Sequence, residues 1–118
     1  MKNIAPEILR KRVLVEAKYT VPISDKTVRD FLLKLPQTLN LRIYGEPVIH
    51  SPEGQGKWEN QGYDGFIPLV DSGIYLGVWA NKKFISCVIY TCKDFSTEKA
   101  VEFTSNFFKT TEIEFMEF

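Results

Sequence analysis

The sequence lacks any long apolar run. No stretch approaches the roughly 18 consecutive apolar residues of a membrane-spanning helix, and residues 1–12 are charged and mixed, unlike a signal peptide. These two absences predict a cytoplasmic protein that does not enter a membrane.

A net charge of one sign is also missing. Fifteen basic residues balance fifteen acidic residues, so no basic field attracts the phosphates of a nucleic acid. The sequence has no glycine-rich phosphate loop, no cysteine and histidine spacing typical of a metal site, and no serine, histidine and aspartate set typical of a hydrolase. We therefore expect no nucleic-acid partner, no bound metal and no triad hydrolysis.

Cysteine is scarce, with only Cys87 and Cys92 in the chain. Both lie in one strand-like run, where five residues at about 3.3 Å each separate them by about 16 Å. A disulfide needs Cα atoms within about 7 Å of each other. The sequence therefore predicts two free thiols, as expected in a reducing compartment.

Apolar and aromatic residues, by contrast, are sufficient for one compact core. Hydrophobic residues make up 44% of the chain and aromatic residues 14%, the composition of an ordinary globular protein. Because 118 residues leave room for one core, we expect a single domain over residues 1–118.

The first half of the chain predicts two strands, one helix and a loop. Apolar and polar residues alternate over 12–19, the period of a half-buried strand. Ser24 can cap a helix that Pro36 ends, with the apolar stripe Val28, Phe31, Leu32 and Leu35. Residues 41–44 predict a short strand, and the glycine-rich stretch 51–63 predicts a loop.

Three strand-like segments follow, over 65–71, 72–79 and 84–92. The last two form a hairpin, and a two-residue turn at Asn81 and Lys82 gives it a register with one wholly apolar face. That register pairs Ile74 with Ile89, Leu76 with Cys87, and Val78 with Ile85.

The same register has a chemical consequence. It pairs Asp71 with Cys92 and so places the Cys92 thiol beside the peptide bond between Asp71 and Ser72. The opposite face of the hairpin is mixed and can be half-solvated, pack on a partner subunit or line a site; it carries Tyr75, Gly77, Trp79, Ser86, Val88 and Tyr90.

The C-terminal part predicts a second helix, capped by Ser96 or Asp94, and a last strand over 112–118. Helices dispersed among mostly antiparallel strands give an α+β two-layer sandwich. Both helices are expected to cover one face of the sheet.

Residues 71–79, Asp-Ser-Gly-Ile-Tyr-Leu-Gly-Val-Trp, and the strand 84–92 that ends Tyr-Thr-Cys resemble the signature region of the short bacterial S-adenosylmethionine decarboxylases. That family carries Glu-Ser-His-Ile-Ser-Ile-His-Thr-Trp and a strand ending Phe-Thr-Cys. The matching positions are Ser72, Ile74, Trp79, Thr91 and Cys92. Upstream, Gly62 and Gly65 match a family segment in which Trp58 falls on a phenylalanine.

The resemblance implies a pyruvoyl enzyme, whose prosthetic group forms when a serine attacks the preceding carbonyl and the chain breaks there. Ser72 is then the precursor, Asp71 the residue before the break, and Cys92 the donor of a proton to the decarboxylated carbon. A pyridoxal cofactor is unneeded on this route. If Ser72 is not processed, no cofactor is implied.

The resemblance also implies a substrate site and a homodimer. Trp58 and Trp79 correspond to rings that sandwich the adenine of S-adenosylmethionine near its sulfonium, where cation–π attraction is available. From residues alone, Trp58 in its loop either caps a pocket or roofs the core, and the roof is favoured by about 2:1.

Two positions depart from the family in ways that weaken self-processing. The histidine five residues after the serine is Gly77, which has no titratable group, and the helper serine is Asp64, whose charge opposes a developing oxyanion. The only histidine, His50, lies far upstream, and its position there gives no reason to expect a substitute base.

Three functions therefore remain at this level. The first is a family member that is not self-processed but retains a site for S-adenosylmethionine or a related amine. The second is an active pyruvoyl-dependent decarboxylase of S-adenosylmethionine, in polyamine biosynthesis, or of an amino acid. The third is a non-catalytic interaction domain or the silent partner of an active subunit.

Overall fold

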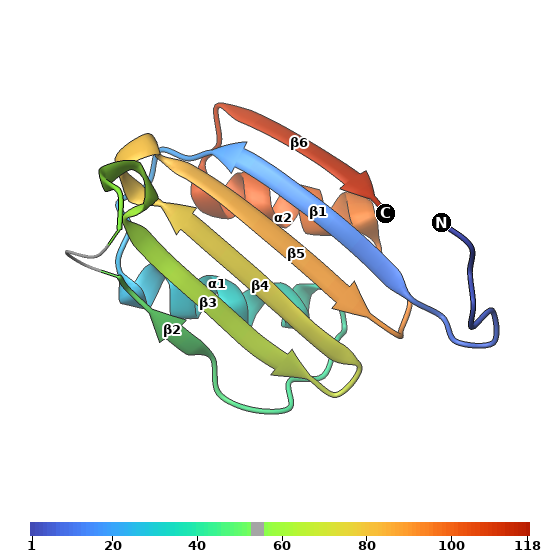
Figure 1. Ribbon diagram of the computed structural model, residues 1–118. Helices are drawn as coiled ribbons and strands as arrows, with labels where there is room; N and C mark the ends of the chain where they lie inside the picture. The colour runs from blue at the N-terminus through green and yellow to red at the C-terminus, as the bar shows by residue number, and fades with distance from the viewer. Residues whose placement is uncertain (53–55) are drawn as a thin grey trace.

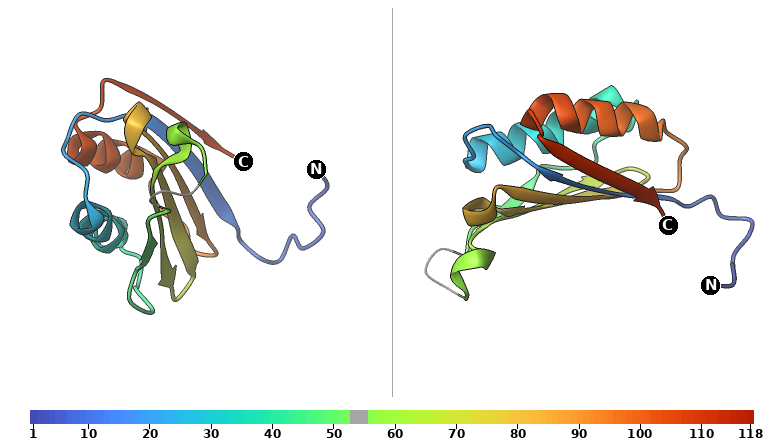
Figure 2. Two further views of the ribbon diagram at one scale, coloured as in Figure 1. Left: turned by 60° about the vertical axis from the view of Figure 1, so that its left-hand side comes forward. Right: turned by 90° about the horizontal axis from the view of Figure 1, so that it is seen from above.

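The computed structural model describes residues 1–52 and 56–118, so part of the predicted loop 51–63, including Gly54, lies outside the described residues. Six strands form one sheet, and both helices pack on the same face of it (Figures 1 and 2). The strands are β1 (Lys11–Lys18), β2 (Val48–His50), β3 (Gly62–Leu69), β4 (Ser72–Trp79), β5 (Phe84–Thr91) and β6 (Glu112–Glu117). The helices are α1 (Asp25–Thr38) and α2 (Thr97–Phe108), with 3₁₀ turns η1 (Trp58–Asn60) and η2 (Ala80–Lys82).

The strand order is β2-β3-β4-β5-β1-β6, and every neighbouring pair is antiparallel. This confirms the predicted α+β two-layer sandwich. Within the part of the chain that the structure describes, no helix is long and apolar enough to span a bilayer.

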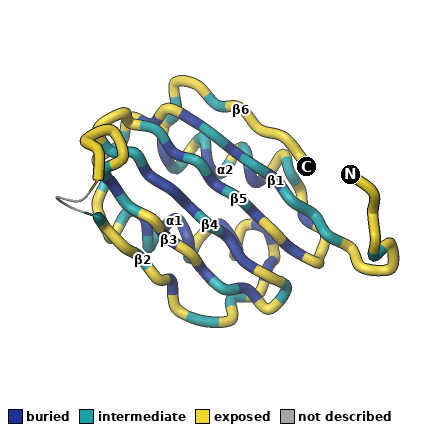
Figure 3. Tube along the Cα trace, in the orientation of Figure 1, coloured by how far each residue is buried: buried dark blue, intermediate teal, exposed yellow. Residues whose placement is uncertain are grey.

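The core lies between the sheet and the two helices. Phe31 of α1 is fully buried, and its ring centroid lies 4.9 Å from that of Phe108 in α2. Ser24 caps α1 as predicted, and Ser96 caps α2. Figure 3 shows that buried positions alternate along β1 and β5 with positions that are less buried. The buried positions face the helices, and the less buried ones lie on the helix-free face of the sheet.

Pro36 does not end the first helix, contrary to the sequence expectation. It lies in the last turn of α1, which continues to Thr38. A proline at this position lacks only the hydrogen bond that its own N–H would donate. Its carbonyl still accepts hydrogen bonds from the backbone N–H groups of Leu39 and Leu41.

The predicted strand 41–44 is also wrong. Ile43 makes only an isolated bridge to Leu69, and the chain reaches strand geometry later, in β2. Because β2 has three residues and two of them are exposed, it lacks the apolar alternation that marks a strand in sequence.

The register of the β4–β5 hairpin is confirmed, with Ile74 opposite Ile89 and Val78 opposite Ile85. The turn differs from the prediction, because residues 80–83 connect the strands through η2, with Lys83 at a φ of 49°. A four-residue connection and a two-residue turn centred on the same pair give the same register, so this error left the pairing intact.

Candidate functional site

Asp71 and Cys92 lie side by side at one end of the hairpin. The backbone N–H of Cys92 donates to the carbonyl of Asp71 at 2.9 Å, and the Cys92 Sγ lies 4.0 Å from Asp71 Oδ1. Ser72 is exposed and follows the tight turn that joins β3 to β4. The predicted placement of a thiol beside the bond between Asp71 and Ser72 is therefore confirmed.

The backbone of Ser72 adopts an unusual conformation, with a φ of 130°. Side chains other than glycine rarely occupy this region, and holding one there costs on the order of 1–3 kcal/mol. The strain falls on the residue that sequence reasoning selected as a pyruvoyl precursor. No pattern in the sequence signalled it.

Two buried polar atoms at this end of the sheet have no hydrogen-bond partner among the described residues: Asp71 Oδ2 and Arg12 Nε. Arg42 Nη2 lies 3.9 Å from Asp71 Oδ2, which is an ion-pair distance but not a hydrogen bond. Buried polar atoms are rarely left unpaired, so these two atoms are an unusual feature of this end of the sheet.

Trp58 and Trp79 lie at the other end of β4. Trp58 is 61% exposed, and Lys82 Nζ lies 5.4 Å from its ring centroid. Trp79 packs on Phe84, with ring centroids 5.4 Å apart. Seven residues of strand, about 23 Å, separate Trp79 from Ser72. One protomer therefore does not bring the two tryptophans together with Ser72 and Cys92.

A third group of polar residues lies partway along the sheet. The Tyr75 hydroxyl donates to Asp64 Oδ1 at 2.7 Å, and Asp64 is directly opposite Gly77 in the β3–β4 pairing. Burial, with a smaller contribution from Asp64, raises the pKa of Tyr75 to about 12, so the phenol is neutral at physiological pH.

His50 belongs to the same row of the sheet, opposite Asp64 in the β2–β3 pairing. The sequence did not indicate that His50 lies next to Asp64, because no strand was expected over residues 48–50. A shallow pocket there is lined by Val48, His50, Asp64, Gly65, Phe66 and Tyr75. No group of three or more His, Cys, Asp or Glu within 1–52 and 56–118 is arranged to hold a metal ion.

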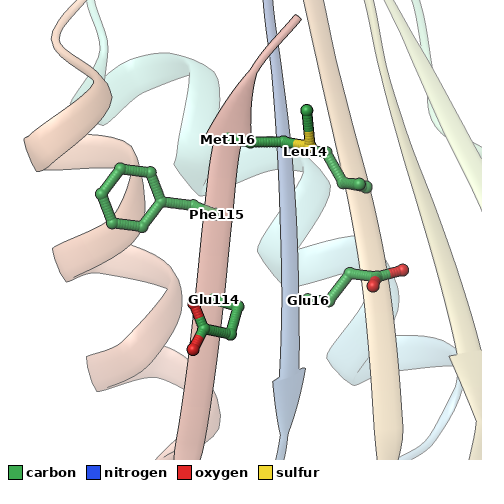
Figure 4. Close-up of a pocket in the computed structure, with 5 residues that line it drawn as sticks. All are labelled: Leu14, Glu16, Glu114, Phe115 and Met116. Atoms are coloured by element: carbon green, nitrogen blue, oxygen red, sulfur yellow. The ribbon is translucent and has the colours of Figure 1, made fainter.

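The helix-free face also carries an apolar row that crosses the whole sheet, one residue from each strand. Its members are Val48, Phe66, Tyr75, Val88, Leu14 and Met116. Val48, Phe66 and Met116 are 53%, 45% and 54% exposed. Figure 4 shows Met116 and Leu14 beside a pocket at the β6 end of the row, while Phe115 points the other way, toward α2.

The two thiols differ in accessibility, since Cys87 is buried and Cys92 is exposed. Burial raises the pKa of Cys87 to about 12, so its thiol stays protonated as well as covered. At pH 8 an aromatic disulfide reagent is expected to titrate one thiol per native chain and two in urea. Cys92→Ser is the control and should leave no reactive thiol in the native protein. Two thiols reacting at equal rates in the native protein would contradict this assignment.

Comparison with known proteins gives matches to one family model and to solved structures. The model of the S-adenosylmethionine decarboxylase family matches residues 12–118. The crystal structure of the adenosylmethionine decarboxylase from Aquifex aeolicus VF5 superposes with a TM-score of 0.74 at 17% sequence identity, over 94% of this chain and 89% of that chain. A search of curated protein sequences found no match. The structural likeness is a likeness of fold.

Proposed function

Because the chain belongs to the S-adenosylmethionine decarboxylase family, we propose that it binds S-adenosylmethionine or a related amine and does not process itself at Ser72. The observation that carries this proposal is the pairing of an exposed aromatic site with a glycine at position 77. Trp58 and Trp79 supply faces for stacking and for cation–π attraction. Gly77 offers no group that can take the α-proton of Ser72.

The residues around the bond between Asp71 and Ser72 fit a pyruvoyl precursor in part. A pyruvoyl group supplies an electron-accepting ketone for decarboxylation, and Ser72 and the neighbouring Cys92 are the right types of residue beside it. The base is what is missing. Tyr75 does not replace it, because its phenol is neutral at physiological pH and is already donating to Asp64.

The separation along β4 supports a site shared between two protomers of a homodimer. A twofold axis that runs along the apolar row would stack the helix-free faces of two protomers. The apolar row of one protomer would then pack on the same row of its partner. Tyr75 lies in that row, so Asp71, four residues before it, would face Trp79 of the partner subunit, four residues after it. On β5, Cys92 would likewise face Phe84 of the partner subunit.

The same arrangement also brings opposite charges together across the interface. Arg12 and Glu16 lie two residues to either side of Leu14, which is in the apolar row. Stacking would therefore set Arg12 over Glu16 of the partner subunit, where the two opposite charges attract each other. The partly exposed Asp71 carboxylate would lie beside the ligand space, where its charge attracts the cationic amine or sulfonium of the ligand.

Intact mass tests the processing part of the proposal. The purified protein, aged for several days and measured under denaturing conditions, is expected to give a single species near 13.6 kDa. Calorimetric titration with S-adenosylmethionine should then show saturable binding, and Trp79→Ala should weaken it by about 10-fold or more. An intact chain that binds neither S-adenosylmethionine nor its decarboxylated product would instead support an interaction domain.

One observation favours a second function, an active pyruvoyl-dependent decarboxylase. Strain at Ser72 raises the energy of the intact chain at the bond that processing would break. Two fragments separating between Asp71 and Ser72 in the aged sample would establish this function in place of the first. Assay of carbon dioxide release from S-adenosylmethionine would then follow.

A further inference from the structure

We infer that Tyr75 fills the space that a side chain at position 77 needs, so that a histidine there is accommodated only when Tyr75 is replaced as well. Positions 75 and 77 are two residues apart on β4 and face the same, helix-free side of the sheet. On this reading, the glycine at 77 and the tyrosine at 75 form one coupled feature.

The contacts around Gly77 carry this inference. A Cβ atom at Gly77 would lie 2.7 Å from the Tyr75 hydroxyl oxygen and 2.8 Å from the Trp79 ring atom Cζ3. Both distances are shorter than Cβ contacts that occur in proteins. An alanine at 77 therefore already requires a neighbouring side chain to move, and an imidazole requires a larger shift.

Tyr75 is held in this position by a specific bond. Its hydroxyl donates to Asp64 at 2.7 Å, and Asp64 is the cross-strand neighbour of Gly77. Turning the phenol away from Gly77 would break that bond and leave the carboxylate without its donor. The Trp79 ring packs against Phe84, so moving it away from Gly77 would disturb that contact.

The three positions in this cluster are among those at which the sequence departs from the family signature and the helper serine described above. Where that signature has serine, histidine and a helper serine, this chain has Tyr75, Gly77 and Asp64. A serine at 75 is short enough to leave the space open. Restoring only the histidine at 77 therefore leaves Tyr75, bonded to Asp64, in the space that the imidazole needs.

Thermal unfolding of a double-mutant cycle tests the coupling directly. Gly77→Ala is expected to lower the unfolding midpoint by on the order of 5 °C in the wild-type background. In a Tyr75→Ser background the shift should fall to about half, because only the contact with the Trp79 ring remains. Gly45→Ala is the matched control, because a Cβ at Gly45 meets only Pro68 at 3.4 Å. Equal midpoint shifts of Gly77→Ala in the two backgrounds would overturn the inference.

A processing experiment extends the test, and its reasoning rests on the proposed function. Gly77→His alone is expected to stay intact by denaturing mass measurement, whereas Gly77→His with Tyr75→Ser and Asp64→Ser should yield at least 10-fold more cleavage between residues 71 and 72. Cleavage of the single variant to the same extent as the triple variant would overturn the inference. Cleavage of the wild type would refute the proposed function alone, because the unfolding cycle does not depend on it.

Discussion

Met116→Glu is expected to weaken self-association of the protein by about 100-fold or more. Met116 is 54% exposed in the protomer and lies at the end of the apolar row on the helix-free face. A twofold interface along that row would bury two introduced carboxylates, one from each protomer, without partners. Sedimentation or light scattering across a concentration series measures the change in the dimer dissociation constant.

Phe115→Glu is the matched control for this prediction. Phe115 is the preceding residue on the same strand and is 52% exposed, but its side chain points toward α2 (Figure 4). The same change of charge on the same edge strand should therefore leave association unaffected. Equal dissociation by both variants, or a wild type that stays monomeric at high concentration, would contradict an interface on the helix-free face.

The proposed interface on this face rests on the distribution of apolar surface more than on any single residue. Helices α1 and α2 cover the other face, whose strand residues are almost wholly buried. The apolar row is continuous from β2 to β6, and the two unpaired polar atoms lie on one side of it. An exposed apolar surface rimmed by polar residues is typical of surfaces that bind another protein.

Much of the fold could be predicted from the sequence, because the strongest signals have regular periods. Alternation over residues 72–79 and 84–92 determined the hairpin register, since a slip of one residue would have exposed its apolar face. The same register placed Cys92 beside Asp71. Ser24 located the start of α1, because its side chain satisfies one of the first backbone N–H groups. For α2 the sequence left the cap open between Ser96 and Asp94, and the structure has Ser96.

Features without a periodic signal could not be predicted. The three residues of β2 form a strand because they pair with β3. This pairing places His50 opposite Asp64. The positive φ of Ser72 arises from the tight turn before it, and serine is not a residue that marks such a conformation. The contact of Tyr75 with the space above Gly77 depends on rotamers fixed by Asp64.

A mixed dimer made from two variants that each fail to bind the ligand is expected to recover ligand binding. Trp58→Ala with Trp79→Ala removes the aromatic end of the site, and Cys92→Arg places a cation at the Ser72 end, where it repels a cationic ligand. Each variant alone should bind S-adenosylmethionine too weakly to measure. After the two are mixed, unfolded and refolded together, about one quarter of the sites should bind by calorimetric titration.

The expected fraction follows from the proposal that each site is shared between two protomers. Random reassociation makes about half of the dimers mixed, and a mixed dimer has one site with an intact Ser72 end from one protomer and an intact aromatic end from its partner. The other site of the same dimer combines both defects. If each site lay within a single protomer, no mixture could contain an intact one, and binding would not return. Mixing either variant with the Met116→Glu form of the other is the control, because it should prevent mixed dimers and so abolish the recovery.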